Sequence, residues 1–455
     1  MTLEKIVNYL KQTGYVYQGS EIYGGLANTF DYGPLGSLLK QNIKDAWKKR
    51  FVTESFYNVL LDSSILLNKE VWVASGHLKG FSDPLTECLS CNNRFRADHL
   101  IELDNKEINP DGWSNEKLFN YLMENKIACP TCGKVKWTEI RKFNLMFKTN
   151  QGVIENEAND VYLRPETAQG IFINFKNIQR TTRRKIPFGV GQVGKAFRNE
   201  ITPGNFIFRT REFEQLELEF FCKPKTEIEW FDYWLKEMET FLFDLGLKKE
   251  NVSLYEHSKD ELSHYSNKTI DILYKYPWGF DELWGIASRT DFDLKAHMEH
   301  SKEDLMYLDP ETNEKYVPYV VEPSLGVERL FLALIKESLV EEELEDGKFR
   351  EVLKLHPYLA PYKVAVLPLI KNRHKEKSEE LYQMLAKHFS VVYDETQTIG
   401  RRYRRQDQIG TPYVITVDDE TLSENTVTIR ERDSMTQVRI KFDELTNYLE
   451  QRVKF

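Results

Sequence analysis

The stretch FGVGQVGKAFRNE (188–200), followed by NFIFRTREFEQLELEFF (205–221), decides the fold of this chain. Both segments are β-rich runs separated by a short turn, which predicts two adjacent antiparallel strands. The charged residues of interest within or beside them are Arg198, Glu200, Arg209, Arg211, Glu212, Glu217 and Glu219. A charge inside a half-buried sheet is costly unless it is paired or used, so we expect something charged to lie on this sheet.

Arg198 and Arg209 give this sheet a candidate phosphate clamp. On facing strands, their planar guanidinium groups would hold phosphate oxygens through bidentate contacts. Phe213, on the second strand, is available to stack on a base. The alternative is a ladder of salt bridges that only stabilises the strands.

The flanking segments predict helices and further strands. Apolar residues fall on one helical face over 35–52, and FYNVLL (56–61) follows as a strand. Aromatic residues recur with helical spacing over 226–250, which indicates a core helix. A strand near 280–287 and a strand-turn-helix at 318–339 complete this region.

After His356-Pro357 the pattern changes to alternating strands and helices. The expected strands are VAVLPLI (364–370), VVYD (391–394), YVITV (413–417) and TVTIR (426–430), and the expected helices cover 376–388 and 443–452. Such alternation is typical of βαβ units. We therefore predict a separate α/β domain at 357–455.

Composition excludes several classes of protein. At about 150 residues per domain, 455 residues favour about three domains over a lone binding module. A net charge of −9 argues against a surface that coats nucleic acid throughout. No apolar run is long enough to span a bilayer, and the first residues lack a signal-peptide pattern. We expect a cytoplasmic enzyme without a membrane association.

Four of the five cysteines form two pairs, Cys88-Leu-Ser-Cys91 and Cys129-Pro-Thr-Cys132. Four thiolates on two tight turns suit tetrahedral Zn²⁺, whose bonds would replace the core that a short insertion cannot build. Neither pair leaves an open ligand position, so the zinc is expected to be structural. The alternative is four reduced cysteines without a metal.

Several ordered stretches resemble class II aminoacyl-tRNA synthetases. FRNE (197–200) with Arg209 resembles motif 2 of that class, and EPSLGVERLF (322–331) resembles motif 3. SEIYGGLANTFDYGPLG (20–36) and YLRPETAQGIF (162–172) are similar to glycyl-tRNA synthetases of the homodimeric type. The resemblance covers nearly the whole chain.

The resemblance implies a fold and an activity. The fold is α+β, with a class II, mostly antiparallel catalytic sheet over 1–356, a zinc-binding insertion at 82–141, a mixed helical insertion at 223–275 and an anticodon-binding domain at 357–455. The activity is ATP-dependent attachment of glycine to the 3′ end of tRNA(Gly) through a glycyl-adenylate, with Mg²⁺ assisting. A homodimer is implied as the working form.

The resemblance also assigns residues position by position. The implied ATP-binding residues are Arg198, Asn199, Glu200, Arg209, Phe213, Glu282, Leu283 and Arg329. Arg198, Arg209 and Arg329 are also the implied catalytic residues, and Glu282 is the residue linked to Mg²⁺. The implied glycine-binding residues are Arg96, Glu166, Glu217, Arg289, Glu322 and Ser324. Carboxylates around the glycine ammonium would leave no room for a Cβ, so specificity would come from excluded volume.

A basic cluster in the C-terminal domain is a candidate contact for tRNA. It consists of Arg401, Arg402, Tyr403, Arg404 and Arg405. Arginines interleaved with an aromatic ring suit phosphate contact and base stacking on single-stranded nucleotides. The alternative is an ordinary solvated strand end.

Two other functions compete with a glycine ligase. A catalytically inactive relative could serve as a nucleic-acid-binding subunit, but it would have no reason to keep the arginine clamp together with three pocket glutamates. A class II ligase for Thr, Ser, Pro or His would need a side-chain pocket, and the EPS (322–324) and RPET (164–167) elements disfavour one.

Overall fold

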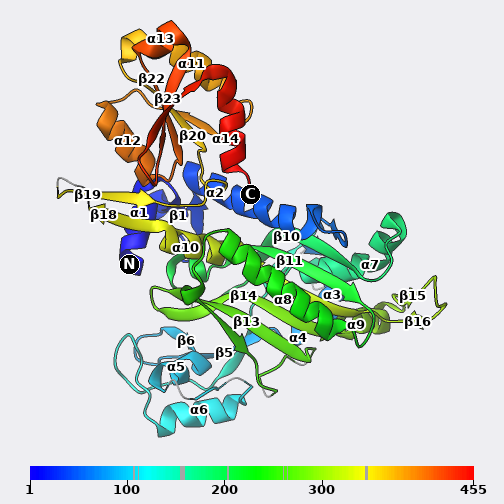
Figure 1. Cartoon of the computed structure of the whole chain (residues 1–455). Helices are drawn as coiled ribbons and strands as arrows, with labels where there is room; N and C mark the ends of the chain where they lie inside the picture. Colours follow the sequence, from blue (N-terminus) through cyan, green and yellow to red (C-terminus); the bar gives the residue numbers. More distant parts are fainter. Residues whose placement is uncertain are drawn as a thin grey trace.

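A seven-stranded sheet forms the centre of the larger body in the computed structural model (Figure 1). The structure describes residues 1–105, 108–110, 112–153, 159–201, 204–259, 261–263, 265–343 and 347–455. The strands, in their order across the sheet, are β12 (Val252–Glu256), β13 (Lys268–Tyr276), β14 (Gly279–Thr290), β17 (Tyr319–Gly326), β11 (Glu212–Cys222), β10 (Phe188–Phe197) and β3 (Asn58–Leu60). All neighbours pair antiparallel except β10 and β3, which are parallel.

The two strands that open the sequence argument pair as predicted. β10 and β11 run antiparallel, with a register from Phe188 opposite Phe221 to Phe197 opposite Glu212. The α+β class and the mostly antiparallel sheet are therefore confirmed.

The two faces of β11 have opposite character. Leu216, Leu218 and Phe220 belong to the main hydrophobic core. The alternate residues Glu217 and Glu219 are also buried, at 2% and 0% exposure, but on the other face of the strand. Residues 216–220 of β11 therefore alternate between an apolar core and a buried charged layer.

Helices cover both faces of the sheet. The helices of this body outside the insertion are α1 (Leu3–Thr13), α2 (Pro34–Lys48), α3 (Lys69–Ala74), α4 (His77–Gly80), α7 (Ala168–Thr182), α8 (Glu227–Asp244), α9 (Phe292–Ser301) and α10 (Val327–Ser338). Buried side chains of α2, α8 and α10 form the main core with the apolar face of β11. Buried side chains of α7 and α9 form a second core against β10 and β17. No helix among the described residues is long and apolar enough to cross a membrane.

Short strand pairs connect these elements. They are β1 (Val16–Gln18) with β2 (Phe30–Tyr32), β4 (Leu66–Leu67) with β9 (Asp160–Leu163) and β8 (Lys148–Asn150), β15 (Tyr307–Leu308) with β16 (Lys315–Tyr316), and β18 (Leu339–Glu343) with β19 (Phe349–Leu353). Residues 223–275, expected as a mixed helical insertion, supply α8 together with β12 and β13 of the central sheet. The apolar stripe of α8 packs on that sheet because Phe231, Trp234 and Phe241 belong to its core.

Between α4 and β8 lies a small unit with its own core. It contains β5 (Ser82–Glu87), β6 (Arg94–Arg96), α5 (Ala97–Asp104), α6 (Asn115–Glu124) and β7 (Arg141–Asn144). Its strands form a separate sheet in the order β6-β5-β7. Figure 1 shows it on the side of the central sheet away from the C-terminal domain.

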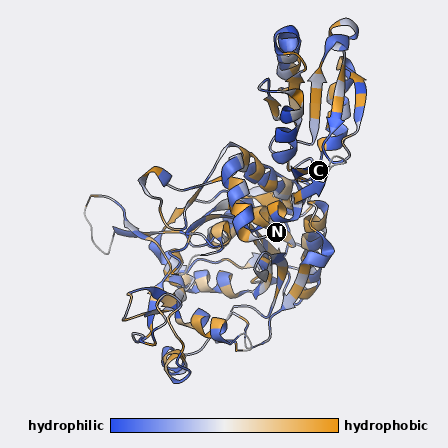
Figure 2. Ribbon diagram, turned by 90° about the vertical axis from the view of Figure 1, so that its left-hand side faces the viewer, coloured by the Kyte–Doolittle hydropathy of each residue, from blue (hydrophilic) through white to orange (hydrophobic). Residues whose placement is uncertain are grey.

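The C-terminal domain is a second α/β body. Its elements are β20 (Val364–Pro368), α11 (Lys371–Leu385), β21 (Val391–Tyr393), α12 (Ile399–Gln408), β22 (Tyr413–Val417), α13 (Asp419–Glu424), β23 (Thr426–Glu431), β24 (Gln437–Lys441) and α14 (Leu445–Val453). The sheet order is β21-β20-β22-β23-β24, and β20 is parallel to both its neighbours. Figure 2 shows hydrophobic residues along these strands and mainly hydrophilic residues on the helices beside them. The predicted strand and helix positions are confirmed here.

One buried carboxylate joins the two bodies. Asp407, at the end of α12, is 0% exposed and accepts hydrogen bonds from Arg430 of β23 at 2.7 and 3.0 Å. It also accepts from Arg350 of β19 at 2.9 Å, so it links the C-terminal sheet to the β18–β19 hairpin. Tyr9 and Tyr15 add hydroxyl bonds to backbone carbonyls just after this point.

Replacing Asp407 is expected to destabilise the whole chain. Asp407→Asn would remove the counter-charge of the buried Arg430 and leave Arg350 with Glu342 as its remaining carboxylate partner, which costs about 3 to 5 kcal/mol. Urea unfolding of the intact chain measures this loss, with the exposed Asp443→Asn as the matched control. A loss below about 1 kcal/mol relative to that control would contradict the joining role of Asp407.

Candidate active site

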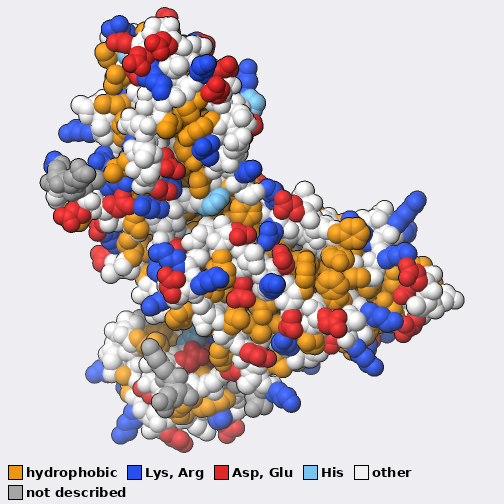
Figure 3. Space-filling view, viewed as in Figure 1, with side chains coloured by type: hydrophobic (Ala, Val, Ile, Leu, Met, Phe, Trp, Pro, Cys, Tyr) orange, Lys and Arg blue, Asp and Glu red, His pale blue; other side chains and the backbone are white. Residues whose placement is uncertain are grey.

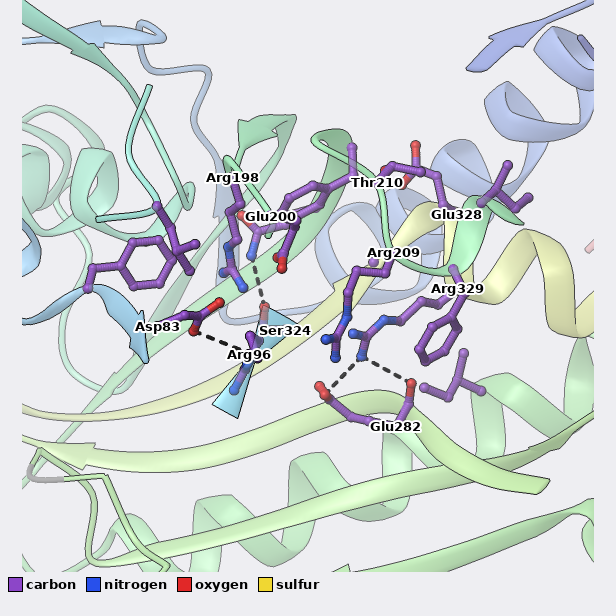
Figure 4. Close-up of a pocket in the computed structure, with 18 residues that line it drawn as sticks. Asp83, Arg96, Arg198, Glu200, Arg209, Thr210, Glu282, Ser324, Glu328 and Arg329 are labelled. Atoms are coloured by element: carbon purple, nitrogen blue, oxygen red, sulfur yellow. Dashed lines mark hydrogen bonds and ion pairs between the residues drawn. The ribbon is translucent and has the colours of Figure 1, made fainter. Parts of the chain in front are cut away.

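A cavity of about 360 Å³ opens between the central sheet and the small unit. Nine of the residues singled out from the sequence line it, namely Arg96, Arg198, Glu200, Arg209, Phe213, Glu282, Leu283, Ser324 and Arg329. Figure 4 shows the labelled residues entering this cavity from several elements. Asn199 is not among its lining residues, and its backbone N–H donates to the Leu145 carbonyl at 2.7 Å.

Arg198 is held between two aromatic rings. Its guanidinium carbon lies 5.3 Å from the ring centre of Phe81 and 5.4 Å from that of Phe213. Its Nε donates to the Pro165 carbonyl at 3.0 Å, which leaves the terminal nitrogens for a ligand. Aromatic faces attract a guanidinium and orient it without neutralising its charge. The cavity therefore holds a positioned guanidinium group whose terminal nitrogens have no hydrogen-bond partner among the described residues.

Arg209 and Arg198 do not lie on facing strands as expected. Arg198 directly follows β10, and Arg209 lies three residues before β11 begins. Both arginines belong to the connection between the strands, where a side chain reaches the cavity instead of the sheet face. The Arg209 side chain therefore enters the cavity from the loop, and the central sheet forms the base of the cavity.

Arg329 lies in the first turn of α10. Its Nη1 lies 2.8 Å from Glu282 Oε2 and donates to the Glu282 carbonyl at 3.1 Å. Its guanidinium lies over Phe208, 4.4 Å from the ring centre. The dashed lines in Figure 4 mark the contacts with Glu282.

A layer of buried carboxylates lies on the same face of the sheet. Glu217 accepts from the Thr167 hydroxyl, and its strand neighbour across the sheet is Ser324. Glu166, just before α7, accepts from Gln169 at 2.9 Å and lies 3.4 Å from His77 Nε2. Ser324 also lines the cavity, so the carboxylate layer adjoins it directly.

Arg289 of β14 orders this layer. It binds Asp293 of α9 through two nitrogens, at 2.7 and 2.8 Å, and donates to Glu322 at 2.8 Å. Only 4% of Arg289 is exposed. A buried guanidinium with three ideal contacts fixes the position of the Glu322 carboxylate.

The carboxyl groups of the layer differ in acidity. Burial raises the pKa of Glu322 despite the opposing charge of Arg289. Burial and the neighbouring Glu166 also raise the pKa of Glu217. His77 and Arg289 outweigh the burial of Glu166 and hold its pKa well below the usual value. Such a group of closely spaced, largely buried carboxyl groups favours a small cation.

Several residues at this site are absent from the sequence assignment, among them Phe81, Asp83 and Glu219. Phe81 and Asp83 line the cavity, and Asp83 lies 3.4 Å from Arg96. Nothing in the local pattern marks either residue, because their partners are distant in sequence. Glu219 has a signal, since strand alternation puts it on the same face as Glu217.

The four paired cysteines come together in the small unit. Cys88 Sγ and Cys132 Sγ are 3.6 Å apart, and Cys91 Sγ and Cys129 Sγ are 3.7 Å apart. All four sulfurs lie within 4.8 Å of one another. A ZnS₄ tetrahedron with bonds of ~2.3 Å has sulfur–sulfur edges of about 3.8 Å, so the donor set fits zinc.

The basic cluster of the C-terminal domain lies on helix α12, and its members divide into two groups. Arg402 is 3% exposed and donates to the Pro368 carbonyl, while the Tyr403 hydroxyl bonds to Thr416 at 2.5 Å. Both residues support the domain from within. Arg401 and Arg404 are exposed, and Arg405 is half-buried against Asp394.

Surface charge is mixed on the face shown in Figure 3. Lys and Arg side chains alternate there with Asp and Glu over both bodies. This agrees with the net charge of −9 and with nucleic-acid contacts limited to local sites.

Two family models match the chain. Residues 147–338 match the tRNA synthetase class II core domain (G, H, P, S and T), and residues 363–452 match the anticodon binding domain. The glycine–tRNA ligase of Clostridium tetani is 61% identical over 100% of this chain and 99% of its own length. That of Acetivibrio thermocellus is 60% identical over 100% of this chain and 99% of its own length.

Solved structures share the fold at low sequence identity. A threonyl-tRNA synthetase structure from Cryptosporidium parvum has a TM-score of 0.66 and 15% identity, covering 98% of each chain. A prolyl-tRNA synthetase structure from the same organism has a TM-score of 0.62 and 14% identity, covering 98% of this chain and 74% of that one.

Proposed function

The chain belongs to the family of glycine–tRNA ligases, and we propose on this basis how its residues activate glycine and transfer it to tRNA(Gly). The family identity, at about 60% over the whole chain, is the observation that carries the function. ATP–pyrophosphate exchange with a panel of amino acids tests it, because only glycine should support exchange.

Arg198 is the proposed centre of the first step. In that step a glycine carboxylate oxygen bonds to the α-phosphorus of ATP as the bond to pyrophosphate breaks. The carboxylate is already ionised, so the step needs no general base. The ring contacts of Arg198 and its free terminal nitrogens support a role in holding both the carboxylate and the α-phosphate. In the second step the terminal ribose hydroxyl of tRNA attacks the glycyl carbonyl carbon and AMP leaves.

The remaining cavity residues suit the rest of ATP. Arg209 and Arg329 are proposed to bind the β- and γ-phosphates, while Phe213 and Glu200 bind adenine. Asn199 and Leu283 are proposed as further ATP contacts. Glu282 offers a carboxylate oxygen of the kind that Mg²⁺ prefers, and the ion would neutralise phosphate charge when bound.

The carboxylate layer is the proposed glycine pocket. Glu166, Glu217 and Glu322 would surround the ammonium, with Ser324 beside them and Arg289 fixing Glu322. The pocket carboxyl groups are largely buried, so the attraction between the ammonium and each carboxylate would be strong. Arg96, which reaches the cavity from the small unit, is proposed to contact substrate as well.

Zinc is proposed for the four-cysteine cluster. When bound, it would hold the small unit together through metal–ligand bonds. The unit's own hydrophobic core is small and includes the buried Cys88 and Cys129. The cluster contributes no residue to the cavity lining. Its proposed role is therefore structural.

Recognition of tRNA and dimer formation complete the proposal. Arg401 and Arg404 are the exposed members of the cluster on α12 and are the proposed anticodon-side contacts, with Arg405 beside them. The edge strand β3 carries Leu60, exposed by 53%, and follows Phe56, exposed by 83%. An apolar sheet edge supports pairing with a second copy, and cysteines that form no disulfide among the described residues support a cytoplasmic location.

Glu217→Gln should chiefly raise the KM for glycine. The substitution keeps the shape of the side chain but removes the counter-charge of the ammonium, a loss of about 2 to 3 kcal/mol. Glycine-dependent pyrophosphate exchange gives both the KM for glycine and kcat. Glu212→Gln, at an exposed position of the same strand, is the matched control. An unchanged glycine KM would remove Glu217 from the pocket.

Arg198→Ala should lower kcat more than it weakens ATP binding. Its charge matters most while negative charge is redistributed at the α-phosphorus. Single-turnover adenylate formation, measured over a range of ATP concentrations, separates the maximum rate from the affinity for ATP. Adenylate formation at the parent rate would show that the ring-held arginine is only structural.

Elemental analysis of protein purified without chelator should give about one zinc per chain. Cys129→Ser should lower that content, whereas Cys222→Ser, outside the cluster, should not. Well-folded active protein without zinc would contradict the proposed metal.

A further inference from the structure

Glu219 is a buried carboxyl group that receives no hydrogen bond from the described residues. It lies two residues beyond Glu217 on β11 and is 0% exposed. Both of its carboxyl oxygens are buried, and within the described part of the chain neither has a hydrogen-bond partner. It has no role in the assignment of glycine contacts given above.

Its surroundings are acidic. Carboxyl oxygens of Glu217, Glu219 and Glu322 all lie within 4.8 Å of one another. Arg289 donates hydrogen bonds to Asp293 and Glu322, and Glu217 accepts from Thr167. Glu219 is therefore the one member of this trio for which the described residues supply no donor.

An ionised Glu219 would be a costly charge in the interior of the larger body. A carboxylate that leaves water and receives no donor loses its solvation without compensation. Two like charges at this separation add repulsion, and carboxyl pairs in that situation keep a proton. Between Glu219 and Glu322, the proton belongs on Glu219, because Glu322 already accepts from Arg289 at 2.8 Å.

We infer that Glu219 is an uncharged positioning residue, whose carboxyl group keeps its proton and donates it in a hydrogen bond to Glu322. The inference rests on the proposed glycine pocket. Glu322 would then be fixed from two sides, by Arg289 and by Glu219. The pocket would present a limited negative charge to one ammonium instead of the charge of every carboxylate around it.

The acidity of the group agrees with this arrangement. Burial and the adjacent Glu322 raise the pKa of Glu219 well above the ordinary value of a glutamate. Contact with Glu219 stabilises the ionised form of Glu322, although burial keeps the pKa of Glu322 high.

Two substitutions at position 219 test the hydrogen bond. Glu219→Met keeps the length of the side chain but has no donor, so we expect the glycine KM to rise about tenfold with a smaller change in kcat. Glu219→Gln is neutral and retains a donor for Glu322, so it should recover most of that loss. Glu217→Gln is the matched comparison on the same strand, and its glycine KM should stay raised.

Infrared spectroscopy tests the proton without relying on activity. A protonated carboxyl group has a carbonyl band that ionised carboxylates lack. At pH 7 the full chain should lose one such band in Glu219→Gln and keep it in Glu217→Gln, with circular dichroism confirming the fold of each variant.

The two measurements also separate the inference from the function. Loss of no band, or a glycine KM for Glu219→Gln raised as far as for Glu217→Gln, would identify Glu219 as ionised and overturn the inference. Absence of glycine-dependent exchange in the parent chain would overturn the function, while the infrared result would still decide the state of Glu219.

Discussion

The burial of charge on one face of the central sheet constrains the rest of the larger body. Glu217 and Glu219 are almost fully excluded from solvent, and Arg289 of β14 lies beside them, bonded to Glu322 and to Asp293 of α9. The layer can persist only if the opposite face supplies ample apolar burial. Helices α2, α8 and α10 provide it by packing on the alternate residues of β11. Stability and ligand chemistry thus occupy opposite faces of the same strands.

Much of this could be predicted from sequence, for definite physical reasons. The β10–β11 pair, the β17–α10 unit and the C-terminal alternation follow from apolar periodicity, which the structure confirms. Nine of the residues that line the cavity were found through the resemblance of their stretches to class II motifs. Arg402 and Tyr403 differ from the expected surface cluster, because consecutive positions of a helix cannot all face solvent. Phe81, Asp83 and the isolation of Glu219 depend on tertiary packing alone.

The small unit ties a distant cluster to the cavity through very few residues. β5 begins beside Asp83 and ends next to Cys88, while β6 starts after Cys91 and ends at Arg96. Leu85 and Arg96 are partners in this short ladder. The orientation of Arg96 therefore depends on the cysteine turns as well as on its bonds to Asp98. A structural role for the cluster does not make it remote from the chemistry.

The contact between Asp407 and Arg350 has a consequence for how such chains recombine. A C-terminal domain transferred alone from residue 357 would carry Asp407 and Arg430 but leave Arg350 behind in the donor. The recipient's own hairpin would have to offer an arginine at the equivalent place. A transferred segment that begins with β18 at Leu339 would keep this contact, because it carries Arg350 together with Asp407.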